Sequence, residues 1–237
     1  MTSKFDTLRS AFHVAFPYTL PVLAAYGILG MSFGAIMTAA GYPVWLPMVM
    51  SLVIFAGSMQ FVTIELLAMA FHPVQAFLMT LMVNARHLFY GISMLEKYRS
   101  MGRSKPYMIF AMTDETFSIN YAAQIPEHVD RKRFMLIVSI LDHSYWVLGS
   151  TLGAVLGSVL SFNTEGLDFA MTAMFVAIFV EQMQKKESRI TALLGLAVSA
   201  VCLVAFGAKD FIIPAMLGIL AVLTILQKPL EKAGVAA

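Results

Sequence analysis

The sequence predicts an all-α fold, a polytopic bundle of transmembrane helices with about seven spans, eight being the alternative. Of the 237 residues, 59% are apolar and only 13% are charged, and the mean hydropathy is +0.78. A water-soluble protein needs more charge than this at its surface. Residues 14–64 hold no charged side chain, which is enough for two spans of about 20 residues each. We therefore expect one integral membrane domain over residues 1–237, in contact with the lipid bilayer.

Turn-forming and charged residues divide the chain into its elements in order. Gly41 to Pro43 separates the first two spans, and His72-Pro73 follows the second. The expected spans cover residues 17–40, 44–70, 74–95, 134–160, 169–183, 190–206 and 211–227. The segment 107–122 is short and contains Asp114 and Glu115, so we interpret it as non-spanning or re-entrant. An eighth span at 107–122 is the alternative.

Basic residues indicate the orientation, because Lys and Arg gather in the short cytoplasmic loops of membrane proteins. The flanks 96–106, 123–133 and 183–189, together with the C-terminus, hold 12 of the 16 Lys and Arg residues. We expect these flanks and the C-terminus in the cytoplasm, and the acidic loop 161–168 outside. In a seven-span topology this leaves Lys4 and Arg9 on the outer side, against the rule.

A weak internal repeat relates residues 26–35 to residues 145–154, with five coinciding positions. In the seven-span topology the two copies run in opposite directions, which is typical of inverted repeats in secondary transporters. The approximate halves are 14–95 and 134–227, joined by a cytoplasmic or re-entrant segment over 96–133. Coincidence in apolar sequence is the alternative explanation.

Small residues and prolines predict local features of two spans. Glycines recur every four residues and predict helix faces that pack closely: Gly30, Gly34, Gly149, Gly153 and Gly157. Pro17 and Pro21 favour a kinked or broken first helix, because a proline removes a backbone donor.

Polar residues within apolar spans mark the candidate substrate site. Gly57, Ser58 and Gln60 form a polar notch, whose groups need partners in hydrocarbon: either neighbouring helices or a substrate. Asn84 and Arg86 lie in the third span. An arginine there is costly unless it is paired or hydrated, and it can hold a carboxylate with two hydrogen bonds. The alternative is that Arg86 extends to the basic loop beyond the span.

Ionisable residues provide the candidates for a coupling ion. His87 is a candidate proton carrier, because the imidazole of histidine is the side chain best suited to exchange a proton near neutral pH. Asp114 or Glu115 can pair with Arg86 or accept a proton if their segment re-enters the membrane; a solvated helix start is the alternative. Asp142 and His143 lie in an otherwise apolar span, where ionisable residues suggest function by default. A structural ion pair is the alternative for Asp142.

Several classes of function lack their usual signature. The chain has no metalloprotease, serine-hydrolase or phosphate-loop motif and no paired cysteines. Its single cysteine, Cys202, excludes an intramolecular disulfide. A net charge of +2 is too small for a nucleic-acid footprint. We therefore expect no enzyme, no cofactor, no metal and no nucleic-acid partner.

Four segments, in order and spacing, resemble one family, the AzlC-like large subunits of branched-chain amino acid exporters: residues 56–61 (AGSMQF), 84–91 (NARHLFYG), 113–117 (TDETF) and 144–153 (SYWVLGSTLG). The resemblance covers most of the chain, from about residue 12 to 226. It implies an inner-membrane transporter that exports valine, leucine, isoleucine or methionine-like neutral amino acids, driven by an ion gradient. It also implies a small AzlD-like membrane subunit as partner.

Motif positions are carried over as candidates for handling substrate or coupling ion: Gly57, Ser58, Gln60, Arg86, His87, Thr113, Asp114 and Glu115. Asn84 stands where some members of the family carry Asp. If that acid is the proton carrier elsewhere, this chain needs His87, Asp114 or Asp142 instead. Two other hypotheses remain open: a non-transporting scaffold or assembly subunit, and an intramembrane enzyme that uses Asp142 and His143.

Overall fold

The computed structural model describes residues 4–68, 72–159, 176, 179–180, 183–184 and 186–232. These residues form helices and no strand, as the predicted all-α class requires. The chain divides into two compact units, residues 1–164 and 165–237. Three of the described helices are long and apolar enough to cross a membrane, over Leu8–Ala39, Arg131–Val159 and Arg189–Gly207. Most of the predicted span over 169–183 lies outside the described residues.

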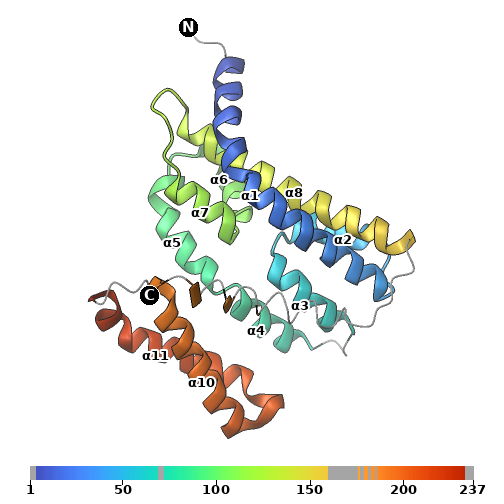
Figure 1. Ribbon diagram of the computed structural model, residues 1–237, viewed down its shortest axis with the longest axis vertical. Coiled ribbons are helices and arrows are strands. Elements are labelled where there is room, and N and C mark those ends of the chain that lie inside the picture. The colour runs from blue at the N-terminus through green and yellow to red at the C-terminus, as the bar shows by residue number, and fades with distance from the viewer. Residues whose placement is uncertain are drawn as a thin grey trace. The chain divides into compact units, whose positions relative to one another are not determined.

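The first unit is built on two long helices, α1 (Lys4–Ala39) and α8 (Arg131–Val159), which pack side by side along most of their length (Figure 1). Glycines make the close approach possible. A Cβ added to Gly149 would lie 2.6 Å from the carbonyl oxygen of Tyr26, and one on Gly34 or Gly153 would overlap the backbone of the opposite helix. The predicted close-packing face is therefore confirmed.

The same contacts show that α1 and α8 run in the same direction. Gly30 lies against Gly149, Gly34 against Gly153, and Gly157 against Ala35 and Thr38. The prediction that the two repeat copies run in opposite directions is therefore wrong. The matched glycines are explained by packing, because two backbones that touch along a parallel pair need small residues at the same intervals on both helices.

The sequence predicted a kinked or broken first helix, and the structure shows that it is not broken. α1 continues through Pro17 and Pro21 over 36 residues. The Thr19 hydroxyl lies 2.9 Å from the carbonyl oxygen of Phe16 and 3.1 Å from the Tyr145 hydroxyl of α8. Threonine hydroxyls and a neighbouring helix can satisfy backbone groups near a proline, so the helix is held in place here by α8.

Between α1 and α8 the chain first forms a helical hairpin, α2 (Trp45–Val53) and α3 (Gly57–Ala68). α2 approaches α8 until the carbonyl oxygen of Ser51 lies 3.2 Å from Nε2 of His143. Phe55 then turns the chain with a positive φ of 44°, which is unusual for a non-glycine residue.

α3 then runs back in the opposite direction along α1 and α8. Gly57 packs against the ring of Trp146, and the ring of Phe61 lies 5.6 Å from that of Phe33, two turns beyond Tyr26 on α1. The α2–α3 pair therefore doubles back, and the predicted single span over 44–70 is wrong. An apolar hairpin and an apolar span have the same composition, so hydropathy does not separate them.

The next two helices follow one another with an interruption between them. α4 (Pro73–Val83) begins beside α3, and α5 (Arg86–Tyr98) continues to the other end of the unit (Figure 1). Between them the N–H groups of His87 and Leu88 bond only three residues back, to Asn84 and Ala85. At the far end, α5 meets the start of α8 around a surface pocket of about 410 Å³, lined by Glu96, Lys97, Ser100, Arg131, Lys132 and Met135.

A second hairpin enters from that basic end. A short 3₁₀ turn (Gly102–Ser104) leads into α6 (Lys105–Phe110), and α7 (Asp114–Ala122) returns. The Tyr107 hydroxyl lies 3.1 Å from Nδ1 of His143, while the Lys97 Nζ donates to the carbonyl oxygen of Tyr121 at 2.7 Å. Met101, just before the hairpin, belongs to the same buried cluster as Phe134 near the start of α8, and Lys97 lines a pocket with Arg131. Both ends of the hairpin thus lie near the start of α8, as the re-entrant interpretation of 107–122 requires and an eighth crossing does not.

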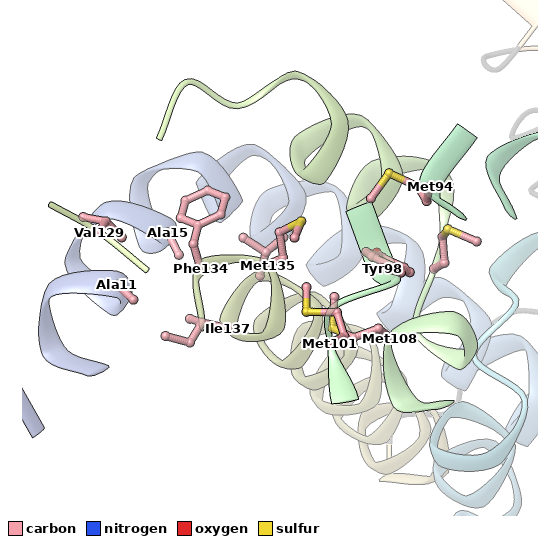
Figure 2. Packing of buried hydrophobic residues seen from close by; sticks show 12 residues of the cluster. Ala11, Ala15, Met94, Tyr98, Met101, Met108, Val129, Phe134, Met135 and Ile137 are labelled. Atoms are coloured by element: carbon pink, nitrogen blue, oxygen red, sulfur yellow. The ribbon is translucent and has the colours of Figure 1, made fainter. Parts of the chain in front are cut away.

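A cluster of buried apolar residues joins the helix ends at this basic end (Figure 2). Ala11 and Ala15 of α1 pack with Phe134 of α8, and Tyr98 and Met101 at the end of α5 belong to the same cluster. The beginning of α1 therefore lies at the same end as the basic flanks 96–106 and 123–133. The sequence-based topology, which separated them, is corrected.

The second unit contains a helix pair, α10 (Lys186–Asp210) and α11 (Ile212–Lys232). α10 is interrupted at Gly207, whose φ is +75°. Gly195 lies near Ile219, and Gly218 near Val198, so the two helices run antiparallel. They coincide with the predicted spans 190–206 and 211–227.

The glycine contact between α1 and α8 provides a direct test of the packing. We expect Gly153→Ala to destabilise the protein by about 1–3 kcal/mol, the usual cost of forcing an extra carbon into a packed interface. Gly27→Ala is the matched control, because no atom lies within 4 Å of a Cβ there. Thermal unfolding in detergent measures both. Equal unfolding temperatures for the two variants would contradict the packing.

Candidate site at the meeting point of the interrupted helices

The turns of the two hairpins meet in the middle of the first unit. The ring of Phe55, at the α2–α3 turn, lies 6.3 Å from that of Phe110, at the end of α6, and 4.4 Å from that of His143. The Tyr26 ring packs edge-on against Phe55 and Trp146. The long helices α1 and α8 therefore carry both turns, and the interruption between α4 and α5 lies beside them.

Arg86 lies at the centre of this meeting point. Its Nη1 forms an ion pair with Oδ2 of Asp114 at 2.6 Å, and its Nη2 donates to Oγ of Ser58 at 3.0 Å. Arg86 therefore does not extend to the basic loop. The anticipated pairing of Arg86 with an acid of the 107–122 segment is present, and the acid is Asp114.

These contacts bring together the N-terminal ends of three helices. Ser58 is the second residue of α3, Arg86 the first of α5 and Asp114 the first of α7. The N-terminus of a helix carries partial positive charge and unpaired N–H groups, so it favours anions. With the Arg86 guanidinium among them, the three ends form a region suited to a carboxylate.

The ion pair retains free binding capacity. Nε of Arg86 and Oδ1 of Asp114 are buried and have no hydrogen-bond partner among the described residues. The two side chains are nevertheless 35% and 37% exposed. The exposure belongs to the other atoms of the two groups, so a small ligand can reach the guanidinium and the carboxylate, each of which also carries one buried, unpartnered atom. Tyr90 and Phe117, one turn further along α5 and α7, stack beside the pair with ring centroids 4.4 Å apart.

A chain of hydroxyl groups runs from this region into α8. The Tyr26 hydroxyl lies 2.6 Å from Oε2 of Glu115 and 2.8 Å from Oγ1 of Thr113. Thr113 caps α7 and lies 3.2 Å from Oγ1 of Thr116, which donates to Oδ2 of Asp142 at 2.8 Å. Asp142 is fully buried, and its Oδ1 has no partner in the described part of the chain.

Asp142 and His143 are adjacent in sequence but face different partners. Asp142 bonds to Thr116 of α7, whereas His143 bonds to Tyr107 of α6 and to the carbonyl oxygen of Ser51. A histidine at the carbonyl end of a helix stabilises that end. His143 therefore attaches both hairpins to α8. The side chains of Asp142 and His143 do not converge on a common point, whereas the enzyme hypothesis requires that they do.

The remaining predicted residues are placed beside the meeting point. Gln60 is fully buried between α2 and α8: its Nε2 donates to Oγ of Ser51 at 3.1 Å, and its Oε1 accepts from Nε1 of Trp146 at 2.8 Å. Its amide is thus engaged in packing. His87 contacts the carbonyl oxygen of Asn84 at 3.1 Å, within the interruption that precedes Arg86.

Comparison of the sequence with known proteins identifies a family. The sequence model of the family described as AzlC protein matches residues 21–160. A relative from Bacillus subtilis, named branched-chain amino acid transport protein AzlC, is 53% identical over 234 residues, which is 99% of this chain and 92% of the relative.

The chain belongs to the AzlC family.

Two other relatives are membrane proteins by name. An uncharacterized membrane protein of Haemophilus influenzae is 42% identical over 227 residues, 95% of this chain and 93% of the relative. The inner membrane protein YgaZ of Escherichia coli is 28% identical over 177 residues, 72% of each chain. No solved structure matches this chain.

The matched AzlC region extends from α1 to the end of α8 and so includes every residue of the meeting point.

The sequence did not predict a role for Tyr26, Thr116 or Ser51, because a single hydroxyl in an apolar helix is common. A signal was available for two of them: Tyr26 begins one repeat copy, and Thr116 lies three residues from the cap Thr113.

Proposed function

We propose that this AzlC-family protein is the large membrane subunit of a secondary transporter, which exports branched-chain and related neutral amino acids: valine, leucine, isoleucine and methionine. The observation that carries the proposal is the Arg86–Asp114 ion pair at the junction of three helix N-termini. The printed name of the Bacillus subtilis relative supports the substrate class.

A zwitterionic amino acid complements this arrangement. Its carboxylate binds the Arg86 guanidinium and the positive ends of α3, α5 and α7, with Ser58 as a further donor. Its ammonium group binds the partly exposed Asp114 carboxylate. One ion pair thus recognises both charges that all amino acids share, and half-helix N-termini play this role for substrate carboxylates in other transporters.

The ion-gradient coupling and the cellular setting belong to the same proposal. Glu115 and Asp142, joined by hydroxyl groups, are the carboxyls placed to carry a proton beside the substrate. A small AzlD-like membrane subunit completes the transporter in the cytoplasmic membrane of a bacterium, and the C-terminus lies in the cytoplasm.

The topology proposed for the first unit has three crossings and two re-entrant hairpins. α1, the interrupted α4–α5 and α8 cross, while α2–α3 enters from one side and α6–α7 from the other. The basic flanks then share the cytoplasmic side with Lys4 and Arg9, so the orientation follows the positive-inside rule without exception in this unit. Counting the span that the sequence predicts over 169–183, together with α10 and α11, as further crossings, both termini are cytoplasmic in this proposal.

Cysteine labelling of intact cells separates this topology from the seven-span one. In a Cys202→Ser background, we expect an impermeant maleimide to label Ala40→Cys, because residue 40 follows α1 at the outer side. Glu127→Cys is the matched cytoplasmic control and reacts only after the membrane is opened. Ala40 and Glu127 are both exposed in the fold. Protection of Ala40→Cys in intact cells would contradict the two-hairpin topology.

Transport by proteoliposomes tests the function itself. The protein is reconstituted with its small partner, and counterflow of radiolabelled leucine is measured. Hydrogen bonds to charged groups contribute about 1.5–3 kcal/mol each, so Arg86→Ala should raise the half-saturation concentration for leucine about 10- to 100-fold. Arg103→Ala, in an exposed turn away from the ion pair, is the matched control.

The same experiment separates transport from a scaffold role. A scaffold subunit gives no counterflow with the wild-type protein, and Arg86→Ala then lowers only the amount of protein in the membrane. Unchanged counterflow by Arg86→Ala at normal abundance would remove Arg86 from the substrate site.

A further inference from the structure

The hydroxyl chain between Glu115 and Asp142 has an unbroken set of hydrogen-bond distances. In order from Asp142 the steps are 2.8 Å to Thr116, 3.2 Å from Thr116 to Thr113, 2.8 Å from Thr113 to Tyr26 and 2.6 Å from Tyr26 to Glu115. All three intermediate groups are hydroxyls that are almost completely buried. A hydroxyl can donate one hydrogen bond while it accepts another.

This property allows the chain to exist in two opposite orientations. When Asp142 holds the proton, it donates to Thr116, Thr116 to Thr113, Thr113 to Tyr26, and Tyr26 to the Glu115 carboxylate. When Glu115 holds the proton, every donor and acceptor is reversed, and Thr116 donates to the Asp142 carboxylate. Each orientation satisfies all four hydrogen bonds.

We propose that Tyr26, Thr113 and Thr116 form a proton relay between Asp142 and Glu115. One proton leaves the Asp142 carboxyl for the Thr116 oxygen as each hydroxyl passes its own proton to the next oxygen. The Glu115 carboxylate accepts the proton of Tyr26. One O–H bond breaks and one forms at each hydroxyl, and the net change is one proton moved from Asp142 to Glu115.

The relay connects a sealed carboxyl to an accessible one. Asp142 is fully buried, whereas Glu115 is partly exposed and follows directly on Asp114 of the ion pair. The proposal rests on the proposed transport function and deepens it: a proton reaching Glu115 arrives one residue from the bound amino acid. The other ionisable groups near the relay are Arg86 and Tyr90 of α5, Tyr107 of α6, Asp114 of α7 and His143 of α8.

Tyr26→Phe interrupts the relay and keeps the aromatic ring that packs on Phe55 and Trp146. Two assays are made on the complex with the small partner: leucine counterflow, which exchanges substrate without net proton movement, and leucine transport driven by an imposed pH gradient. We expect gradient-driven transport to fall on the order of 100-fold, the usual contribution of a positioned proton donor. Counterflow should persist.

Tyr145→Phe is the matched control, because it removes another buried tyrosine hydroxyl, the one that contacts Thr19 between α1 and α8. It should leave both assays near the wild-type level. Thr116→Val and Thr116→Ser form a second pair: valine should abolish gradient-driven transport, and serine, which keeps the hydroxyl, should restore it. This pair decides the proposal if Tyr26→Phe does not fold.

The failures of the two proposals are distinguishable. If the wild-type complex shows no counterflow, the transport function is wrong and the relay with it. If wild-type counterflow is present and Tyr26→Phe keeps gradient-driven transport, transport stands and the relay is overturned. Equal loss of both assays in Tyr26→Phe or Thr116→Val also overturns the relay, since these residues then only shape the site.

Discussion

An arginine within an apolar helix bundle needs a partner, because unpaired charge in hydrocarbon costs at least about 2.5 kcal/mol. In this protein the partner is Asp114, and the arrangement of the first unit follows from bringing the two together. The helix must be interrupted between α4 and α5 so that Arg86 lies at the N-terminus of α5, and α7 must begin at Asp114 beside it. α3 supplies Ser58 from the opposite hairpin. The ion pair thus connects three segments that are distant in sequence.

The two long helices provide the rigid support for this junction. α1 and α8 approach so closely at their glycines that they act as one body, and each hairpin is attached to it at its turn. His143 holds α2 and α6, and Tyr26 contacts both Phe55 and Thr113. In the proposed transporter, movement of one hairpin relative to this body opens the site toward one side. The proposed topology has two hairpins that enter from opposite sides, which are the two moving elements that alternating access requires.

Hydropathy and charge predicted the all-α class, the long helices α1 and α8, and the two helices of the second unit, because each is a long apolar run with clear ends. The pairing of Arg86 with Asp114 also followed from the cost of an isolated charge. The α2–α3 hairpin did not, since Phe55 turns the chain without a glycine or proline at the turn itself. The parallel direction of α1 and α8 depends on that hairpin, so one missed turn inverted the predicted topology. The partners of Gln60, Ser51 and Trp146, could not be predicted because they meet only in the fold.

The central claim is that Arg86 and Asp114 recognise the two charges of an amino acid, and calorimetric binding tests it most directly. Leucine is compared with leucinamide, which lacks the carboxylate, on the wild-type complex and on Arg86→Ala. The account predicts that the wild-type complex binds leucine about tenfold or more tightly than leucinamide, and that Arg86→Ala binds both weakly and alike. Equal wild-type affinity for the two ligands, or undiminished preference for leucine in Arg86→Ala, would contradict it.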